Sequence, residues 1–150
     1  MSELSSRPEL SGICGTLGIQ LGEFGNGKCT VMATVDAEHL NAGGVAHGGL
    51  ATTMLDTALG AALVSTLLKQ EWCATAQLDV SFMNAAQIGM NLIANGEIIR
   101  RGKNLAHLSG ELVDGDGKLI ATAKGTWAVW ESKPSSLKRN TANAGKALIS

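Results

Sequence analysis

The chain alternates between apolar and polar residues on both sides of one long apolar segment. Residues 16–22 and 28–36 each place an apolar side chain at every second position, and a Gly-Asn-Gly turn at 25–27 separates them. A period of two is typical of a strand with one buried face, and a short glycine-containing turn joins such strands into a hairpin. The first part of the chain therefore predicts a β-hairpin.

The second part of the chain consists of strand patterns. The four runs are 74–82, 91–100, 104–113 and 118–130. Turn signals at 101–103 and 114–117 separate the last three runs. The alternation is strictest in the first run, which predicts that Ala74 and Ala76 share one face of the strand and that Thr75 lies on the other. The Asp-Gly-Asp-Gly sequence at 114–117 predicts a hairpin turn between the last two runs.

Between the two strand regions, residues 48–68 are rich in Ala and Leu and carry a single charge, Asp56. The segment follows a glycine-rich loop at 41–49 and ends near Lys69. About twenty residues at 1.5 Å each predict a helix of roughly 30 Å. A charge near mid-span disfavours membrane insertion by roughly 2.5–3.5 kcal/mol, so we expect a helix buried in protein.

The predicted order is β-β-α-β-β-β-β, with one long helix wrapped by a curved, mostly antiparallel sheet. This is the description of a hot-dog fold in the α+β class. Strands and helices do not alternate, which excludes a doubly wound nucleotide-binding fold. We expect one domain over residues 1–131 and a loose tail over 132–150, where small polar residues show no consistent period.

Composition narrows the function further. The formal net charge is −1, so we expect neither a nucleic acid nor an anionic membrane as a partner. The three cysteines are scattered, which favours reduced thiols in a cytoplasmic protein and a place among small core residues. Residues 1–12 lack the apolar stretch of a secretory signal. The histidines lack metal-ligand spacing, so no metal site is expected.

Asp56 and the start of the predicted helix are the candidates for chemistry. Burial makes a lone carboxylate more basic, which suits a general base or a nucleophile, although a merely paired or solvent-facing Asp fits the pattern equally well. Gly48 and Gly49 lie where backbone N–H groups lack internal partners, at the positive end of the helix dipole. They form a candidate oxyanion site, or else only permit a tight turn.

Three further residues near these positions have two interpretations each. Asn41 either hydrogen-bonds a substrate oxygen or water, or closes an Asx-turn at the start of its loop. His47 either transfers a proton or is structural. Thr75 either contributes to the site or is only a solvent-facing strand residue.

Gly48 and Asp56 are eight residues apart, which is about 12 Å along a helix. Both cannot touch one reacting carbonyl from a single helix. If both are catalytic, Gly48 of one chain faces Asp56 of another, and an isologous homodimer follows.

Asn41, the His47-Gly48-Gly49 run and Asp56, in this order of elements, resemble the hot-dog acyl-CoA thioesterases of the phenylacetate-pathway (PaaI-like) type. The resemblance covers roughly residues 10–131. It implies hydrolysis of an acyl-CoA to a carboxylic acid and free CoA, with Asp56 activating water or attacking the thioester directly. The N–H of Gly48 would hold the thioester carbonyl oxygen, and Asn41 would orient the water or the carboxylate.

The resemblance implies roles for two more residues and an assembly. Thr75 matches a position where the family often has Ser or Thr near the acid, and His47 matches a histidine whose role is more structural than chemical. The family is similar in forming a homodimer or a dimer of dimers, with the site at the dimer interface. It uses no metal or prosthetic group, because coenzyme A is part of the substrate.

The chain also departs from the family pattern. Asn84-Ala85 stands where the family often has Arg-Pro, so the acyl group is left open, and Ala42 replaces a frequent proline. Arg100, Arg101 and Lys103 are candidates for binding the phosphates of coenzyme A, or simply form a solvated turn.

Two other functions of the same fold stay open. One is a non-catalytic protein that binds acyl-CoA. The other is a hydratase or dehydratase that pairs His47 with Asp56, although the chain lacks the His-Phe-Pro motif of those enzymes.

Overall fold

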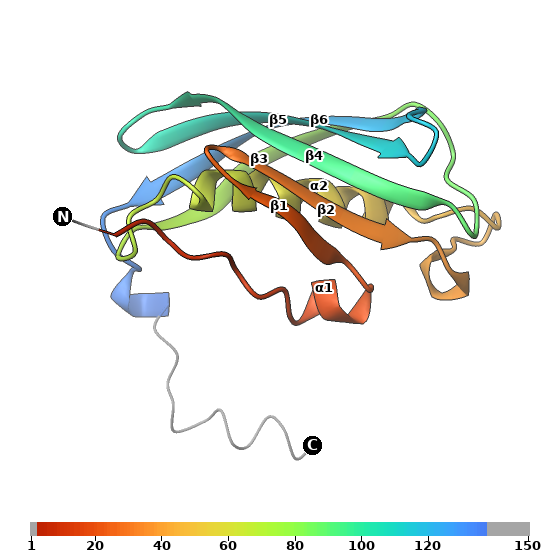
Figure 1. Cartoon of the computed structure of the whole chain (residues 1–150), viewed down its shortest axis with the longest axis horizontal. Helices are drawn as coiled ribbons and strands as arrows, with labels where there is room; N and C mark the ends of the chain where they lie inside the picture. Colours follow the sequence, from red (N-terminus) through yellow and green to blue (C-terminus); the bar gives the residue numbers. More distant parts are fainter. Residues whose placement is uncertain (1–2, 138–150) are drawn as a thin grey trace, which may run out of the picture.

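The computed structural model describes residues 3–137 and shows one six-stranded antiparallel sheet curved over one long helix (Figure 1). The strands stand in the order β1-β2-β4-β5-β6-β3, so β1 and β3 form the two edges. The elements are α1 (Ile13–Thr16), β1 (Gln20–Gly25), β2 (Lys28–Thr34), η1 (Ala37–His39), α2 (Gly48–Val64), β3 (Trp72–Phe82), β4 (Asn91–Arg101), β5 (Leu105–Asp114), β6 (Leu119–Trp130) and η2 (Ser135–Leu137). The predicted hot-dog fold and the predicted order of elements along the chain are confirmed, and the short helices α1, η1 and η2 are additions.

The two ends of the chain lie partly outside the described residues. Of the predicted tail, Ser135–Leu137 forms the 3-10 turn η2, and 138–150 lie outside the described residues. Across residues 3–137, no helix is long and apolar enough to cross a membrane.

Helix α2 ends at Val64, earlier than the predicted end near Lys69. The Ser65 hydroxyl explains this end. It donates to the carbonyl of Ala62 at 2.7 Å and accepts the backbone N–H of Gly27 at 2.8 Å. Because this hydroxyl ties the last turn of the helix to the β1–β2 turn, the chain leaves the helical path there.

The core lies between α2 and the concave face of the sheet. The largest helix side chains that are fully buried are Met54, Leu55, Leu59 and Leu63. Gly96 on β4 lets the helix approach, since a Cβ at that position would lie 2.7 Å from the carbonyl oxygen of Ala58. The sheet therefore packs directly against the helix backbone. Asp56, on the same helix, lies beside the packed core.

Strand β3 contains a β-bulge that corrects the predicted alternation. Thr75 pairs with Trp127 and Gln77 pairs with Thr126, so Ala76 is the extra residue. A bulge places two residues opposite one and switches the faces of the strand that precedes it. Unbroken alternation from 74 to 82 would place Thr75 on the face opposite Leu78. That part of the prediction was wrong, and Thr75 faces the helix together with Trp127, which is buried.

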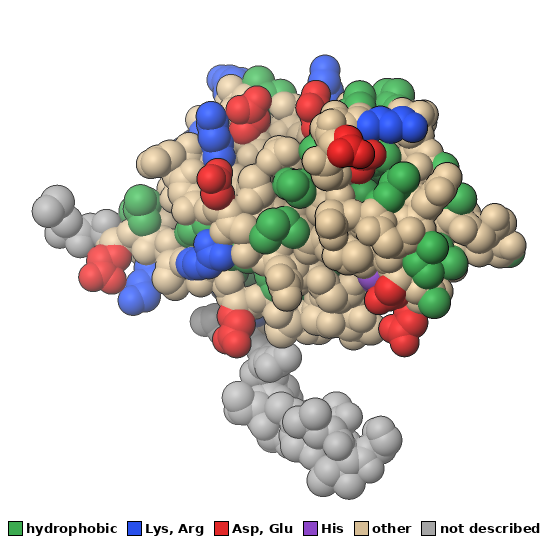
Figure 2. All heavy atoms as spheres, turned by 45° about the vertical axis from the view of Figure 1, so that its right-hand side comes forward, with side chains coloured by type: hydrophobic (Ala, Val, Ile, Leu, Met, Phe, Trp, Pro, Cys, Tyr) green, Lys and Arg blue, Asp and Glu red, His purple; other side chains and the backbone are tan. Residues whose placement is uncertain are grey.

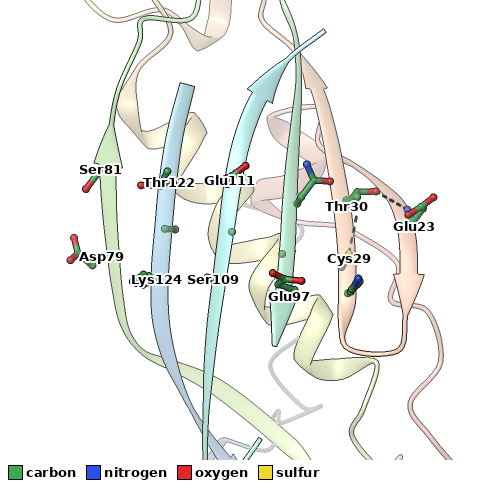
Figure 3. A pocket seen from close by; sticks show the side chains of 15 residues that line it. Glu23, Cys29, Thr30, Asp79, Ser81, Glu97, Ser109, Glu111, Thr122 and Lys124 are labelled. Atoms are coloured by element: carbon green, nitrogen blue, oxygen red, sulfur yellow. Dashed lines mark hydrogen bonds between the residues drawn. The ribbon is translucent and has the colours of Figure 1, made fainter. Parts of the chain in front are cut away.

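The face of the sheet that points away from α2 is polar. One row of register neighbours crosses five strands and consists of Lys28, Glu97, Ser109, Lys124 and Asp79. Figure 3 shows these side chains along a hollow of about 670 Å³, with the helix behind the sheet. The sheet separates this hollow from Asp56. Figure 2 shows acidic, basic and apolar side chains interspersed over the surface, in keeping with the small net charge.

Candidate active site

Asp56 lies in the middle of α2, is half-buried and is held by a strand residue. The hydroxyl of Thr75 donates a hydrogen bond to Asp56 Oδ1 at 2.7 Å. This contact exists because the bulge at Ala76 turns Thr75 toward the helix. A hydroxyl donor fixes the orientation of a carboxylate and leaves its second oxygen open to a reacting group. The structure thus brings together two of the predicted site residues.

Cys73 is a neighbour of this pair that the sequence did not single out for the site. Burial raises the pKa of the Cys73 thiol to about 11, while the Arg101 guanidinium lowers it and the Asp56 carboxylate raises it. The thiol is therefore protonated at neutral pH and does not compete with Asp56 as a nucleophile. Arg101 is itself paired with Glu71, with 3.5 Å between its Nη2 and Glu71 Oε1.

The start of α2 has one N–H group without a partner. His47 is the N-cap, and its Nδ1 accepts the N–H of Gly49 at 2.8 Å. The carbonyl of His47 accepts the N–H of Leu50 at 2.9 Å. Between these two satisfied donors, the N–H of Gly48 makes no hydrogen bond within residues 3–137. This is the geometry of an open donor at the positive end of a helix.

His47 serves this helix start structurally. Because its Nδ1 accepts a hydrogen bond, the neutral imidazole carries its proton on Nε2. The ring is exposed, so that second N–H faces solvent or a ligand. His47 therefore has the expected structural role as the N-cap of α2, and its Nε2–H group is left to donate to solvent or a ligand.

Asn41 closes its own loop, as one of its two interpretations proposed. Its Oδ1 accepts the N–H of Gly43 at 2.9 Å and the N–H of Val45 at 3.3 Å. The side-chain Nδ2 group makes no hydrogen bond within the described part of the chain, and the residue is exposed. Asn41 thus shapes the loop that leads into α2 while keeping a donor free.

The three basic candidates do not converge within one chain. Arg100 pairs with His107 and Arg101 pairs with the buried Ala106, so the two arginines, as successive residues of one strand, point to opposite faces. The guanidinium of Arg101 also donates to backbone carbonyls of its own turn. Lys103 is exposed in that turn. Their contact with coenzyme A phosphates stays a prediction.

An apolar pocket of about 370 Å³ opens beside Gly48. The ring of Phe82 forms its wall at this point, because a Cβ at Gly48 would lie 3.2 Å from Phe82 Cε1. Met83 continues the wall into the loop after β3. This pocket was not predicted from the sequence, since Gly48 and Phe82 are brought together only by the packing of β3 along α2. Across residues 3–137, His, Cys, Asp and Glu side chains form no group of three suited to a metal ion.

A curved antiparallel sheet around one helix, with a carboxylate in mid-helix and an open N–H at the helix start, defines a hot-dog protein with the groups needed for acyl hydrolysis. The chain belongs to the Thioesterase superfamily, whose sequence profile matches residues 43–121. This match spans α2, β3, β4 and β5, which contain Gly48, Asp56, Thr75 and Phe82.

Individual relatives agree with this assignment. Human acyl-coenzyme A thioesterase 13 is 32% identical over 101 residues, which make up 67% of this chain and 71% of the human protein. Among solved structures, the conserved protein PA5202 from Pseudomonas aeruginosa superimposes with a TM-score of 0.77 at 25% identity, covering 81% of this chain and 95% of that protein. The PaaI protein of E. coli gives a TM-score of 0.72 at 25% identity, covering 77% and 81%.

These comparisons confirm the predicted resemblance to hot-dog thioesterases and the prediction that the chain is a thioester hydrolase. The roles of individual residues stay predictions and are taken up next.

Proposed function

We propose that the protein hydrolyses acyl-CoA thioesters, with Asp56 as the reacting carboxylate. The observation that carries the proposal is the pair formed by Asp56 and Thr75, in a chain that also presents the open N–H of Gly48. The substrate class follows from the named activity of human acyl-coenzyme A thioesterase 13. The reaction consumes one water and yields a carboxylic acid and free coenzyme A.

In the general-base form of the mechanism, Asp56 accepts a proton from water as the water oxygen bonds to the thioester carbon. The carbonyl oxygen becomes negative and is held by the N–H of Gly48. The carbon–sulfur bond then breaks, and the leaving thiolate takes the proton from Asp56. In the nucleophilic form, Asp56 attacks the same carbon, releases the thiolate and forms an anhydride that water hydrolyses. Single-turnover hydrolysis in ¹⁸O-water separates the two forms, since only the second leaves label in the protein.

The two halves of this site must come from two chains. Eight residues of helix separate Gly48 from Asp56 by about 12 Å, which exceeds the reach of one reacting carbonyl. The edge strand β3 supplies a way to join them: Thr75, near its start, bonds Asp56, and Phe82, at its end, lies against Gly48. If two copies pair antiparallel along this edge, the start of one β3 lies beside the end of the other. Asp56 of each copy then faces Gly48 of the second copy, giving two sites per homodimer.

The other candidate site residues, Thr75, His47 and Asn41, have supporting roles in the proposed mechanism. Thr75 orients Asp56 through its hydroxyl, and His47 fixes the first turn of α2 so that the N–H of Gly48 stays open. Asn41 orients the water or the carboxylate through its Nδ2 group. No metal or prosthetic group takes part in any step.

Thiol release from a panel of acyl-CoAs tests the proposal. We expect turnover by the wild type and loss of nearly all turnover in Asp56→Asn, which keeps the size of the side chain. Circular dichroism and light scattering establish that the variant stays folded and dimeric. Saturable binding of acyl-CoA without thiol release by the wild type would contradict hydrolysis and point to a non-catalytic binding protein.

A further inference from the structure

The apolar pocket beside Gly48 is closed at its inner end. Its floor is formed by Leu92, Leu112 and Ile120, which are 1%, 0% and 3% exposed. The remaining walls are contributed by Ala46, Leu50, Ala51, Phe82, Met83, Ala85 and Ala86, with His47 and Asn84 as the polar residues. No charged side chain lines it. The pocket is thus a blind apolar chamber, lined mainly by aliphatic side chains.

The pocket lies where one arm of the substrate must go. An oxyanion donor sits about 2.7–3.1 Å from the oxygen that it stabilises. A thioester whose carbonyl oxygen is held by the N–H of Gly48 therefore has its carbonyl carbon within a few ångströms of Phe82, which contacts Gly48. Either the acyl chain or the sulfur-linked arm enters the chamber, since both are attached to that carbon.

The chemistry of the walls decides between these two arms. The pantetheine arm of coenzyme A contains two amides and continues to charged phosphates, which need polar partners and an exit to water. The amide Nδ2 of Asn84 already donates to the carbonyl of Leu119 at 2.7 Å. A chamber whose lining is apolar except for His47 and Asn84, and which has no charged side chain, fits an apolar acyl chain instead.

We propose that this chamber is the acyl subsite, that it takes an aliphatic acyl group, and that Phe82 and Met83 determine the chain length accepted. The proposal rests on the proposed function and adds the identity of the acyl group to it. Phe82 and Met83 lie at the mouth, 57% and 51% exposed, so their side chains can be changed without opening the core.

The first readout is binding by Asp56→Asn, which separates affinity from catalysis. Calorimetry with straight-chain acyl-CoAs of increasing length should show Kd falling about fourfold for each added methylene until the chamber is full, because each buried methylene contributes about 0.8 kcal/mol.

Variants at the mouth make the test specific to this chamber. Met83→Trp should move the optimum to shorter chains, and Met83→Ala should move it to longer ones. Ile88→Ala is the matched control, because Ile88 is equally exposed in the same loop but does not line the chamber. This variant should keep the wild-type profile.

The outcomes separate the two proposals. A Kd that is independent of chain length, or a length profile that neither Met83 variant shifts, would overturn the acyl subsite even if the wild type releases thiol from every substrate. Absence of thiol release from the wild type, with the chain-length profile and its shifts intact, would overturn hydrolysis and leave the subsite standing.

Discussion

Thr75 on the edge strand β3 donates a hydrogen bond to Asp56 on the buried helix α2, with 2.7 Å between Oγ1 and Oδ1. The contact joins two elements that are otherwise linked by apolar packing, and it depends on the bulge at Ala76. It gives the proposed reacting carboxylate a fixed direction beside the edge strand, where the proposed second copy of the chain would reach it.

The first prediction concerns this hydroxyl. Thr75→Val keeps the shape of the side chain and removes its donor, so kcat should fall by roughly 10–100-fold, as expected for a hydrogen bond to a charged group. Thr75→Ser retains the donor and should stay within a few-fold of the wild type. A loss of equal size in both variants would show that packing at Thr75, and not its hydroxyl, matters for the reaction.

The second prediction concerns the N–H of Gly48. Proline is tolerated at the first position of a helix, and the extended backbone of His47 (φ −59°, ψ 139°) suits a following proline. Gly48→Pro therefore removes the N–H while keeping the helix. Gly48→Ala is the control, because its Cβ meets Phe82 in the same way but its N–H remains. The proline variant should be about 10²–10³-fold slower in kcat than the alanine variant. Equal rates would remove Gly48 from the oxyanion site.

The third prediction concerns the helix cap. His47→Ala removes the acceptor for the N–H of Gly49 and should lower the free energy of unfolding by about 1 kcal/mol. His47→Asn supplies a capping oxygen and should recover most of that loss in denaturant unfolding. If the asparagine variant is no more stable than the alanine variant, His47 does not stabilise α2 through its cap.

The fourth prediction concerns pH. Burial raises the pKa of the Cys29 thiol from 9.0 to about 11, so the folded protein favours the protonated thiol. The stability that this provides is fully present below pH 9 and is lost as the pH rises toward 11. Urea unfolding across this range should show a shallower decline for Cys29→Ala than for the wild type. Parallel declines would mean that Cys29 does not contribute to the alkaline loss.

The order of elements followed from the sequence because apolar alternation and turn residues mark the strands and Asp56 is the only charge in residues 48–68. The bulge at Ala76 did not follow, since one extra residue in a strand leaves no mark in composition. As a result, Thr75 was placed on the wrong face, and its part in the site stays a prediction. The register shift becomes visible only in the pairing of β3 with β6, where Thr75 lies opposite Trp127.

The candidate site, like the fold, could be predicted only in part from the sequence. Asp56, Gly48 and His47 stood out because an isolated acid and a His-Gly-Gly helix start are local patterns. The chamber walled by Phe82 did not, because it depends on contacts between positions more than thirty residues apart. The end of α2 was misplaced for the same reason, since Ser65 is fixed by Gly27 in a distant turn.

The most direct test of a site shared between two chains is the activity of a defined heterodimer. Asp56→Asn and Gly48→Pro chains carrying different affinity tags are coexpressed, and the heterodimer is isolated by two successive purifications. One of its two sites then combines Asp56 of one chain with Gly48 of the other and is intact, while the second site carries both changes. Thiol release per heterodimer should be about half that of the wild-type dimer, although each homodimeric variant is nearly inactive. A heterodimer no more active than the two variants would contradict a site shared across the dimer.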